Sequence, residues 1–287
     1  MTTAADYKSR IRITWCPGCG DYGVLNALQT ACAALNIENS SLVIVSGIGC
    51  SSDLPHFMNA YGIHTLHGRA VPVAQGIKMA NMNLNVVITG GDGDGYGIGV
   101  GHFIHALRRN LDLTYIVMDN QIYGLTTGQA SPTSVKCVKT KSSPEGNPEN
   151  ALNPIALALV GGATFVARGF SGDPVQLAEV MRRALAHKGF SLVDVFSPCV
   201  TWNKLNTYAW FRERVFKLES DGHDSSNLDA AIRQAMRADD RLPLGVFYEA
   251  DRPTFDQDEP SLQGEPLVQG RMGLTDEEWN GLIEEFM

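Results

Sequence analysis

The sequence lacks a long apolar run and an excess of positive charge. No segment approaches the ~18 consecutive apolar residues of a membrane-spanning helix, and the opening MTTAADYKSRIR has no apolar core of a secretory signal. We therefore expect a cytoplasmic protein. Lys and Arg number 23 against 31 Asp and Glu, a formal net charge of −8. This balance leaves no basic stripe for a nucleic-acid duplex.

Internal repeats and low-complexity tracts are also missing. With 44% hydrophobic and 19% charged residues, the composition excludes disordered, collagen-like and coiled-coil chains. The negative charge is concentrated at one end of the chain. The segment from Asp251 to Met287 contains ten acidic residues and only two basic residues, Arg252 and Arg271. An acidic end of this kind is typical of a solvated or partner-contacting tail, with the solvated face favoured.

Short apolar runs alternate with helical stretches, which is typical of a mostly parallel sheet flanked by helices, the α/β class. The predicted strands cover 42–45, 86–89, 114–118, 163–166 and 192–196. The predicted helices cover 22–35, 73–83, 98–109, 154–159, 174–187, 208–218 and 228–236. We expect an α/β domain over residues 1–200, then a C-terminal helical extension and extended acidic arm over 201–287.

A glycine-rich segment, GGDGDGYGIG, directly follows the predicted strand 86–89 and contains Asp92. Gly91 and Gly93 allow the backbone to approach a diphosphate, and the next helix start offers N–H groups to anionic oxygens. Asn120 follows the next strand, so it and Asp92 should meet at the carboxyl edge of the sheet. Their oxygens suit a small divalent cation. The alternative is a glycine-rich turn capped by an aspartate.

Four cysteines lie in three short motifs, WCPGCG, SGIGCSS and FSPCV. They are Cys16, Cys19, Cys50 and Cys199. A Cys-x-x-Cys turn presents two sulfurs to an iron–sulfur cluster or to a tetrahedral zinc, and the spacing leaves both open. The position of Cys50 after strand 42–45, at the predicted edge of Asp92, favours a redox cluster.

The other two cysteines are predicted not to bind metal. Cys32 lies on a helical face, and Cys137 lies in the aperiodic stretch 126–153, which is long enough to be a functional loop. His102 and His105, on the helix after the glycine-rich segment, are interpreted as packing residues instead of a metal pair.

Six segments together are similar to the β subunit of the 2-oxoacid:ferredoxin oxidoreductases, over roughly residues 12–220. They are WCPGCGDYG, SGIGCSS, HTLHGRA, GGDGDGYGIG, DNQIYGLTTGQASPTS and SPCVTWNKLNTYAWFRERV. The sequence has DN at 119–120 where many thiamine-diphosphate enzymes have NN. The resemblance implies a domain that binds the diphosphate half of thiamine diphosphate, Mg²⁺ and one [4Fe-4S] cluster.

The resemblance also implies the residue roles. The cluster ligands would be Cys16, Cys19, Cys50 and Cys199. Mg²⁺ would be held by the side chains of Asp92 and Asn120 and the main-chain carbonyl of Ile122. The cofactor contacts would be Ile48, Gly49, Cys50, Ser51, His67, Gly93, Asp94, Gly124 and Leu125.

The implied activity is the coenzyme A-dependent oxidative decarboxylation of a 2-oxoacid, with electrons passed through the cluster to ferredoxin, in either direction. An α subunit would supply the glutamate beside the aminopyrimidine, within a heterodimer that forms (αβ)2, so we predict no catalytic residue in this chain. The alternatives are a non-redox thiamine-diphosphate decarboxylase or carboligase with a structural zinc, a zinc-stapled binding module and a noncatalytic regulatory subunit.

The substrate is predicted to be 2-oxoglutarate, with pyruvate as the second choice. Candidate partners for a substrate carboxylate are Arg69, Lys136 and Lys139. Asp53 follows the GIGCSS segment where family members often have a basic residue. Because of this difference, we do not assign Asp53 the role in substrate specificity that the resemblance would imply for this position.

Overall fold

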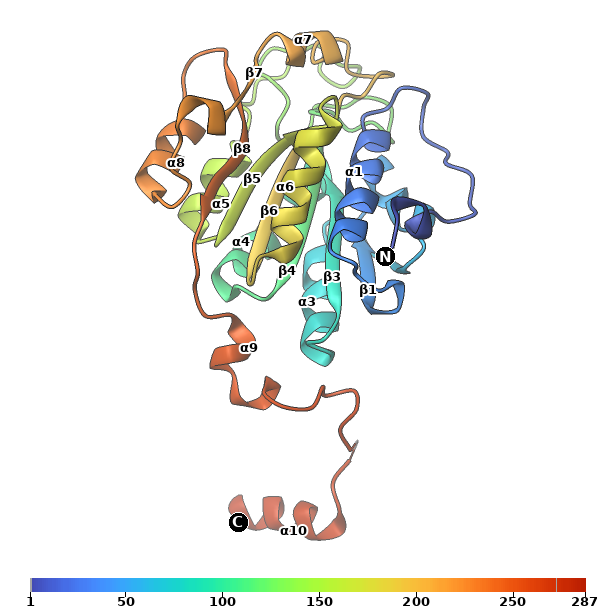
Figure 1. The fold of residues 1–287 in the computed structure, drawn as a ribbon, viewed down its shortest axis with the longest axis vertical. Coiled ribbons are helices and arrows are strands. Elements are labelled where there is room, and N and C mark those ends of the chain that lie inside the picture. Colours follow the sequence, from blue (N-terminus) through green and yellow to red (C-terminus); the bar gives the residue numbers. More distant parts are fainter. Residues whose placement is uncertain (1, 272) are drawn as a thin grey trace.

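The apolar runs of the sequence form the inner strands of one sheet (Figure 1). The computed structural model describes residues 2–271 and 273–287. The inner strands are β1 (Leu42–Ser46), β3 (Asn85–Gly91), β4 (Leu113–Asp119), β6 (Phe190–Phe196) and β5 (Phe165–Phe170). They are mutually parallel and almost entirely buried, as predicted for a sheet covered on both faces.

Three further strands complete an eight-stranded sheet in the order β2-β1-β3-β4-β6-β5-β8-β7. They are β2 (Tyr61–His64), β7 (Val215–Lys217) and β8 (Leu242–Glu249), and β8 runs antiparallel to β5. The segment after residue 200 is therefore not purely helical, since it adds two strands to the sheet. The helix predicted over 208–218 is wrong in its second half, because α7 (Tyr208–Arg212) ends before β7 begins.

Helices cover the two faces of the sheet and give it two hydrophobic layers (Figure 1). One layer packs beneath α1 (Asp21–Ala34) and α6 (Pro174–Ala186). The other packs beneath α3 (Ala70–Ala80), α4 (Val100–Arg109), α5 (Pro154–Gly161) and α8 (Leu228–Ala235). Local capping fixes α6, because the Asp173 side chain accepts a hydrogen bond from Gln176 N and Pro174 occupies the first turn.

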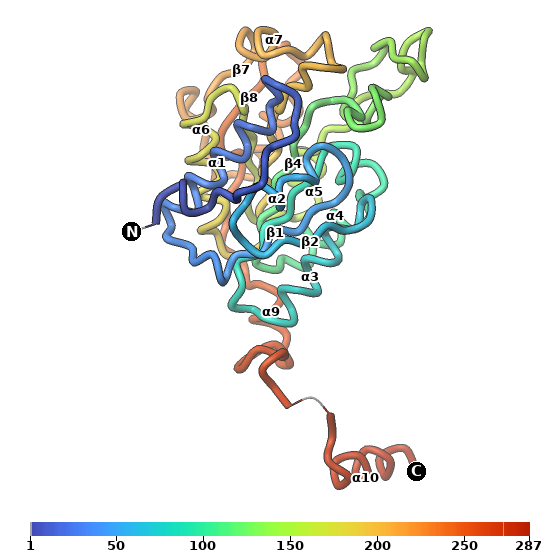
Figure 2. The backbone as a smooth tube through the Cα atoms, turned by 90° about the vertical axis from the view of Figure 1, so that its right-hand side faces the viewer, coloured from blue at the N-terminus to red at the C-terminus, as the bar shows by residue number. Residues whose placement is uncertain are grey.

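The C-terminal arm leaves the body of the molecule after β8 (Figures 1 and 2). It contains the short helix α9 (Phe255–Asp258) and the terminal helix α10 (Asp276–Glu285), so the prediction of an extended arm missed its helices. A capping box between Thr275 and Glu278 starts α10. No helix of the described chain has the length and apolar character needed to cross a bilayer.

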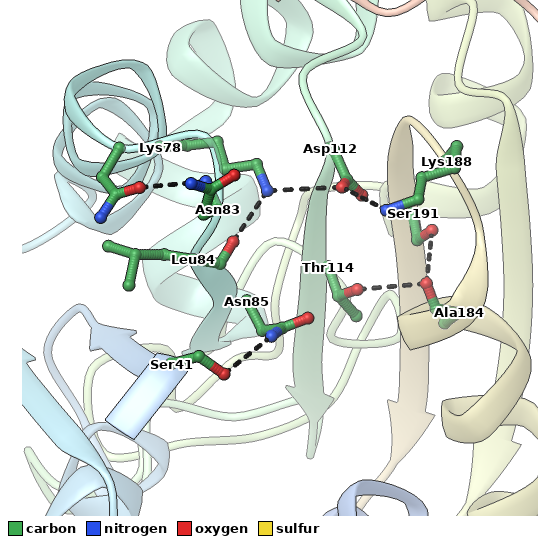
Figure 3. Close-up of polar contacts among 11 residues, drawn as sticks. Ser41, Lys78, Asn83, Leu84, Asn85, Asp112, Thr114, Ala184, Lys188 and Ser191 are labelled. Atoms are coloured by element: carbon green, nitrogen blue, oxygen red, sulfur yellow. Dashed lines mark hydrogen bonds and ion pairs between the residues drawn. The ribbon is translucent and has the colours of Figure 1, made fainter. Parts of the chain in front are cut away.

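The amino ends of the central strands are tied together by ion pairs (Figure 3). Asp112, just before β4, accepts from Lys78 Nζ at 3.3 Å and from Lys188 Nζ at 3.2 Å. The buried Lys78 also donates to the Leu84 carbonyl at 2.7 Å. Asp112, Lys78 and Lys188 therefore form a group of paired charges at this edge of the sheet.

Candidate cofactor and cluster site

The carboxyl ends of four parallel strands meet at the opposite edge of the sheet. Register pairs Ser46 of β1 with Thr89 of β3, and Asp119 of β4 with Phe196 of β6, so the loops that follow these strands lie together. Each loop carries one of the motifs singled out in the sequence. The strand order therefore brings together segments that are far apart along the chain.

A narrow cavity of about 70 Å³ lies among these loops, and we call it the Asp92 pocket. Its lining includes every residue predicted to contact the cofactor or magnesium. These are Ile48, Gly49, Cys50, Ser51, His67, Asp92, Gly93, Asp94, Asn120, Ile122, Gly124 and Leu125. The donor set of one carboxylate, one amide and one carbonyl at Asp92, Asn120 and Ile122 is of the kind that Mg²⁺ prefers.

The carboxylate of Asp94 holds together the loops that form the walls of this pocket. Its Oδ1 accepts from Ile48 N at 2.9 Å and from Gly68 N at 2.8 Å, and His67 Nδ1 lies 2.9 Å away. Burial raises the pKa of Asp94, and the two backbone donors oppose that rise. The carboxylate of Asp94 therefore links two loops to the glycine-rich turn.

Gly93 is required by close packing. A Cβ atom at this position would lie 2.1 Å from Cε1 of Tyr123. The Tyr123 hydroxyl donates to the Gly93 carbonyl at 3.1 Å, which holds the turn against the ring. The absence of a side chain leaves the backbone of the turn open to the pocket.

Two buried carboxyl groups at this edge share one hydroxyl. Thr133 Oγ1 lies 2.6 Å from Asp92 Oδ2 and 2.7 Å from Asp119 Oδ1, and a hydroxyl can donate to only one of them at a time. Burial raises the pKa of Asp92 to about 6 and the pKa of Asp119 well above its usual range. A divalent cation would offset this uncompensated negative charge.

Thr133 belongs to the long loop predicted to be functional, but sequence reasoning did not single it out. The adjacent Ser134 Oγ donates to the Gln121 carbonyl at 2.6 Å and anchors the loop to the chain after β4. The only signal in the sequence was the length and polarity of the loop, since its path across the site depends on tertiary contacts.

The four motif cysteines line a second cavity of about 280 Å³, here called the cysteine pocket. It is lined by Cys16, Cys19, Cys50 and Cys199, together with Trp15, Asp53 and Trp202 among others. Burial raises the pKa of the Cys50 thiol to about 12 and also raises the pKa of Cys19. A bound metal would reverse this shift by favouring the thiolates.

The two pockets adjoin at Gly124. A Cβ atom there would lie 3.6 Å from Cys199 Sγ, 3.7 Å from Cys50 Sγ and 3.9 Å from Asn120 Nδ2. Both cavities share Cys50, Asn120, Gly124 and Leu125 in their linings. The sulfur groups and the predicted cation ligands therefore face one another across a glycine.

Comparisons with known proteins identify the family. The model of the thiamine pyrophosphate enzyme C-terminal TPP binding domain matches residues 47–195, and that of the C-terminal part of the pyruvate ferredoxin oxidoreductase beta subunit matches residues 199–264. The 2-oxoacid:ferredoxin oxidoreductase 1 subunit beta of Aeropyrum pernix is 48% identical over 254 residues, which cover 85% of this chain and 80% of the relative. The chain belongs to the 2-oxoacid:ferredoxin oxidoreductase β subunits.

Two further matches are proteins named for 2-oxoglutarate. The 2-oxoglutarate synthase subunit KorB of Methanocaldococcus jannaschii is 36% identical over 250 residues, or 86% of this chain and 92% of the relative. The solved 2-oxoglutarate:ferredoxin oxidoreductase from Magnetococcus marinus, with 2-oxoglutarate, coenzyme A and succinyl-CoA bound, aligns with a TM-score of 0.91 and 43% identity. The alignment covers 98% of this chain and 96% of that one.

The remaining predicted residues of this β subunit lie apart from its Asp92 pocket. Arg69 and Lys136 line neither that pocket nor the cysteine pocket, whereas Lys139 lines a third cavity together with Trp202. Asp53 lines the cysteine pocket.

The two cysteines predicted not to bind metal also lie outside both pockets. Cys32 is buried in α1, and Cys137 is exposed in the long loop. His102 and His105 lie on α4 and line neither cavity. Across residues 2–271 and 273–287, no three His, Cys, Asp or Glu side chains converge closely enough to hold a single metal ion.

Proposed function

We propose that this β subunit acts with an α subunit in the coenzyme A-dependent oxidative decarboxylation of a 2-oxoacid to an acyl-CoA and carbon dioxide, with ferredoxin as electron acceptor. The observation that supports this most is the junction of the two pockets at Gly124. Cys50, Cys199 and Asn120 surround this glycine, which supports electron transfer between the groups that the two pockets would hold. A cofactor-binding domain with a purely structural metal would not need this proximity.

In the Asp92 pocket, Asp92, Asn120 and the Ile122 carbonyl would hold Mg²⁺. The backbone of Gly93 and the segment at Gly124 and Leu125 would line the diphosphate. Thiamine diphosphate, when bound, supplies the carbanion chemistry that releases carbon dioxide from a 2-oxoacid. This chain provides binding and orientation, and the α subunit would supply the glutamate beside the aminopyrimidine.

In the cysteine pocket, Cys16, Cys19, Cys50 and Cys199 would hold a [4Fe-4S] cluster. A single zinc needs four ligand atoms at about 2.0–2.3 Å from one point. The sulfurs here surround a cavity of about 280 Å³, which supports a polynuclear cluster better than one ion. Such a cluster would supply a one-electron carrier between the neighbouring cofactor site and ferredoxin.

We propose 2-oxoglutarate as the substrate, with pyruvate as the alternative. The names of the M. jannaschii relative and the M. marinus structure support 2-oxoglutarate. The assembly is proposed to be (αβ)2. The same residues and cofactors would serve the oxidative decarboxylation of the 2-oxoacid and the reverse reaction, the carboxylation of an acyl-CoA.

The test is anaerobic co-expression with the α subunit, followed by iron, sulfide, magnesium and thiamine analysis. A panel of 2-oxoacids is then assayed with coenzyme A and a viologen acceptor. We expect about four irons per αβ unit and the highest kcat/KM with 2-oxoglutarate. A colourless protein that contains zinc and decarboxylates without reducing viologen would support the non-redox alternative instead.

A further inference from the structure

The long loop 126–153 contains a short buried segment, residues 131–134, to which the proposed function gives no role. Three of its four residues carry hydroxyl groups, namely Ser131, Thr133 and Ser134, and their side chains are between 2% and 4% exposed. A buried hydroxyl group costs free energy unless it forms a hydrogen bond. The partners of these groups therefore show what the segment does.

The segment is anchored by bonds that do not involve its middle hydroxyl group. Ser134 Oγ donates to the Gln121 carbonyl at 2.6 Å and accepts from Ser131 N at 2.8 Å. The Leu152 amide donates to the Pro132 carbonyl at 2.8 Å, which ties the far end of the loop to the segment. These bonds hold the loop in place against the chain that follows β4.

The hydroxyl group of Thr133 is directed at the buried carboxyl groups instead. Its Oγ1 lies 2.6 Å from Asp92 Oδ2 and 2.7 Å from Asp119 Oδ1. Asp119 Oδ1 already accepts from Gln121 N at 3.2 Å. A hydroxyl group has a single hydrogen to donate, and we assign it to Asp92, the nearer acceptor. The loop thus holds one oxygen atom of the carboxylate that lines the Asp92 pocket.

We propose that Thr133 is a positioning residue for the cation site, an inference that rests on the proposed function. Its hydroxyl group holds one oxygen of Asp92, so that the carboxylate keeps a fixed orientation and its other oxygen is left for Mg²⁺. Thr133 itself does not touch the cation. Hydrogen-bond partners of metal ligands orient those ligands, and their loss typically weakens metal binding about 10–100-fold.

The local structure makes Thr133 a stiff support. A β-branched side chain has few χ1 rotamers, and this one is 4% exposed. Pro132, directly before it, has a fixed φ, and its Cγ would lie 3.4 Å from a Cβ atom added at Gly97. The χ2 angle of an aspartate is loosely defined by comparison. A fixed hydroxyl group would therefore restrict the rotation of the Asp92 carboxylate.

The alternative is that Thr133 only stabilises the loop. The anchors at Ser134 and Leu152 favour the positioning role, because they would remain if the Thr133 hydroxyl group were removed. The two roles also predict different results. A loop-stabilising residue would change the folding of the loop, whereas a positioning residue changes the affinity for the cation in a loop that stays folded.

The test uses the α-bound complex with thiamine diphosphate and with Mn²⁺ as the probe of the cation site. Mn²⁺ takes the oxygen ligands that suit Mg²⁺, and the unbound ion is measured by its EPR spectrum. T133V replaces the hydroxyl group by a methyl group, and T133S keeps the hydroxyl group. The matched control is T140V on the same loop, where Thr140 Oγ1 accepts from Ser143 N at 3.1 Å and lines neither pocket.

We expect the dissociation constant of Mn²⁺ to rise about 10–100-fold in T133V, to return close to the wild-type value in T133S and to be unchanged in T140V. Excess Mg²⁺ should restore thiamine diphosphate retention in T133V, because the ligands themselves are intact. If T133V does not fold, T133A provides the same comparison with a smaller side chain.

Limited proteolysis of the loop separates positioning from folding. T133V should be cleaved as slowly as the wild type. S134A loses the bond to the Gln121 carbonyl but keeps the Thr133 hydroxyl group, so its loop should be cleaved faster while its affinity for Mn²⁺ falls much less than that of T133V.

Three outcomes would overturn the inference. The first is equal affinity for Mn²⁺ in T133V and the wild type. The second is faster cleavage together with an equal loss of affinity in T133V and S134A, which would show a loop-stabilising role. The third is a T133S variant that binds Mn²⁺ as weakly as T133V, which would assign the effect to packing of the methyl group.

Failure of the proposed function would be seen separately. A wild-type complex that binds Mn²⁺ and thiamine diphosphate but oxidises no 2-oxoacid would reject the proposed activity and leave the role of Thr133 standing. A wild-type complex that binds no Mn²⁺ would reject the cation site at Asp92 and the positioning role with it.

Discussion

The two edges of the sheet differ in whether their buried charged groups have partners of opposite charge. At the amino edge, the buried Lys78 is paired with Asp112, which also pairs with Lys188 (Figure 3). At the carboxyl edge, Asp92 and Asp119 share a single hydroxyl, and burial raises the pKa of both. The first edge is balanced by ion pairs within the chain, whereas Asp92 and Asp119 have no ion-pair partner among the described residues. This difference identifies the carboxyl edge as the functional one.

The largest effect is expected from removing the carboxylate of the Asp92 pocket. Asp92→Ala should abolish Mg²⁺-dependent retention of thiamine diphosphate, because the cation would lose its only carboxylate among the proposed ligands. The cluster should remain, since the cysteine pocket does not include Asp92. Thiamine and iron analyses after gel filtration measure both, and full thiamine retention would remove Asp92 from the site.

Two cysteine variants, one inside and one outside the cysteine pocket, test which thiols bind the cluster. Cys199→Ala should lose most of the iron and sulfide, because Cys199 lines the cysteine pocket, whereas Cys137→Ala should keep both, because Cys137 lies outside it. Iron and sulfide are determined on protein purified under anaerobic conditions. Equal loss from the two variants would overturn this division of the cysteines.

Removing the ion pair between Asp112 and Lys78 at the amino edge should lower the stability of the protein and leave the cofactors in place. Asp112→Ala deprives the buried Lys78 of its ion-pair partner, and we expect a loss of about 1–3 kcal/mol in the free energy of unfolding. Denaturant unfolding of the apoprotein measures this change. Thiamine and iron contents should equal those of the wild type, and a selective loss of cofactor would contradict the separation of the two edges.

A smaller change tests the junction of the pockets. Gly124→Ala adds one methyl group at 3.6–3.7 Å from two sulfurs, an ordinary contact in the apoprotein that would crowd a bound cluster. We expect normal apoprotein stability but reduced cluster loading. Gly101→Ala on α4, whose added Cβ meets nothing within 4 Å, is the control. Full cluster loading in Gly124→Ala would place the cluster farther from this glycine.

The smallest effect concerns pH. The raised pKa of Asp92, about 6, means that the folded apoprotein binds more protons than the unfolded chain between the ordinary aspartate pKa and that value. The stability contributed by this group is therefore lost as pH rises through this window. Asp92→Asn should flatten the decline in apoprotein Tm between pH 4 and pH 6. An unchanged slope would show that Asp92 does not carry this proton.

Continuity of apolar residues decided how well the strands could be predicted. The inner strands are uninterrupted apolar runs, so their existence and parallel arrangement followed from the sequence. β2, with the exposed sequence YGIH, and β8, which contains Pro243 and Gly245, lack that pattern and were missed. Their positions depend on pairing with neighbours, which no local signal specifies.

The site residues were predictable where a motif coincides with a strand end. Asp92, Asn120 and Cys50 follow strands that turned out to be near neighbours, and the sheet order brings their loops together. The position of Thr133 could not be predicted in this way. It depends on how the long loop folds back over the carboxyl edge of the sheet, where the Thr133 hydroxyl meets Asp92 and Asp119.

The most direct test of the account is electron transfer between the two pockets. Anaerobic αβ complex loaded with thiamine diphosphate and Mg²⁺ is mixed with 2-oxoglutarate, and the visible absorbance of the cluster is followed. The account predicts bleaching that occurs in the wild type and is lost in Asp92→Ala although its iron content is unchanged. A loaded wild-type complex that decarboxylates 2-oxoglutarate while its cluster stays oxidised would contradict it.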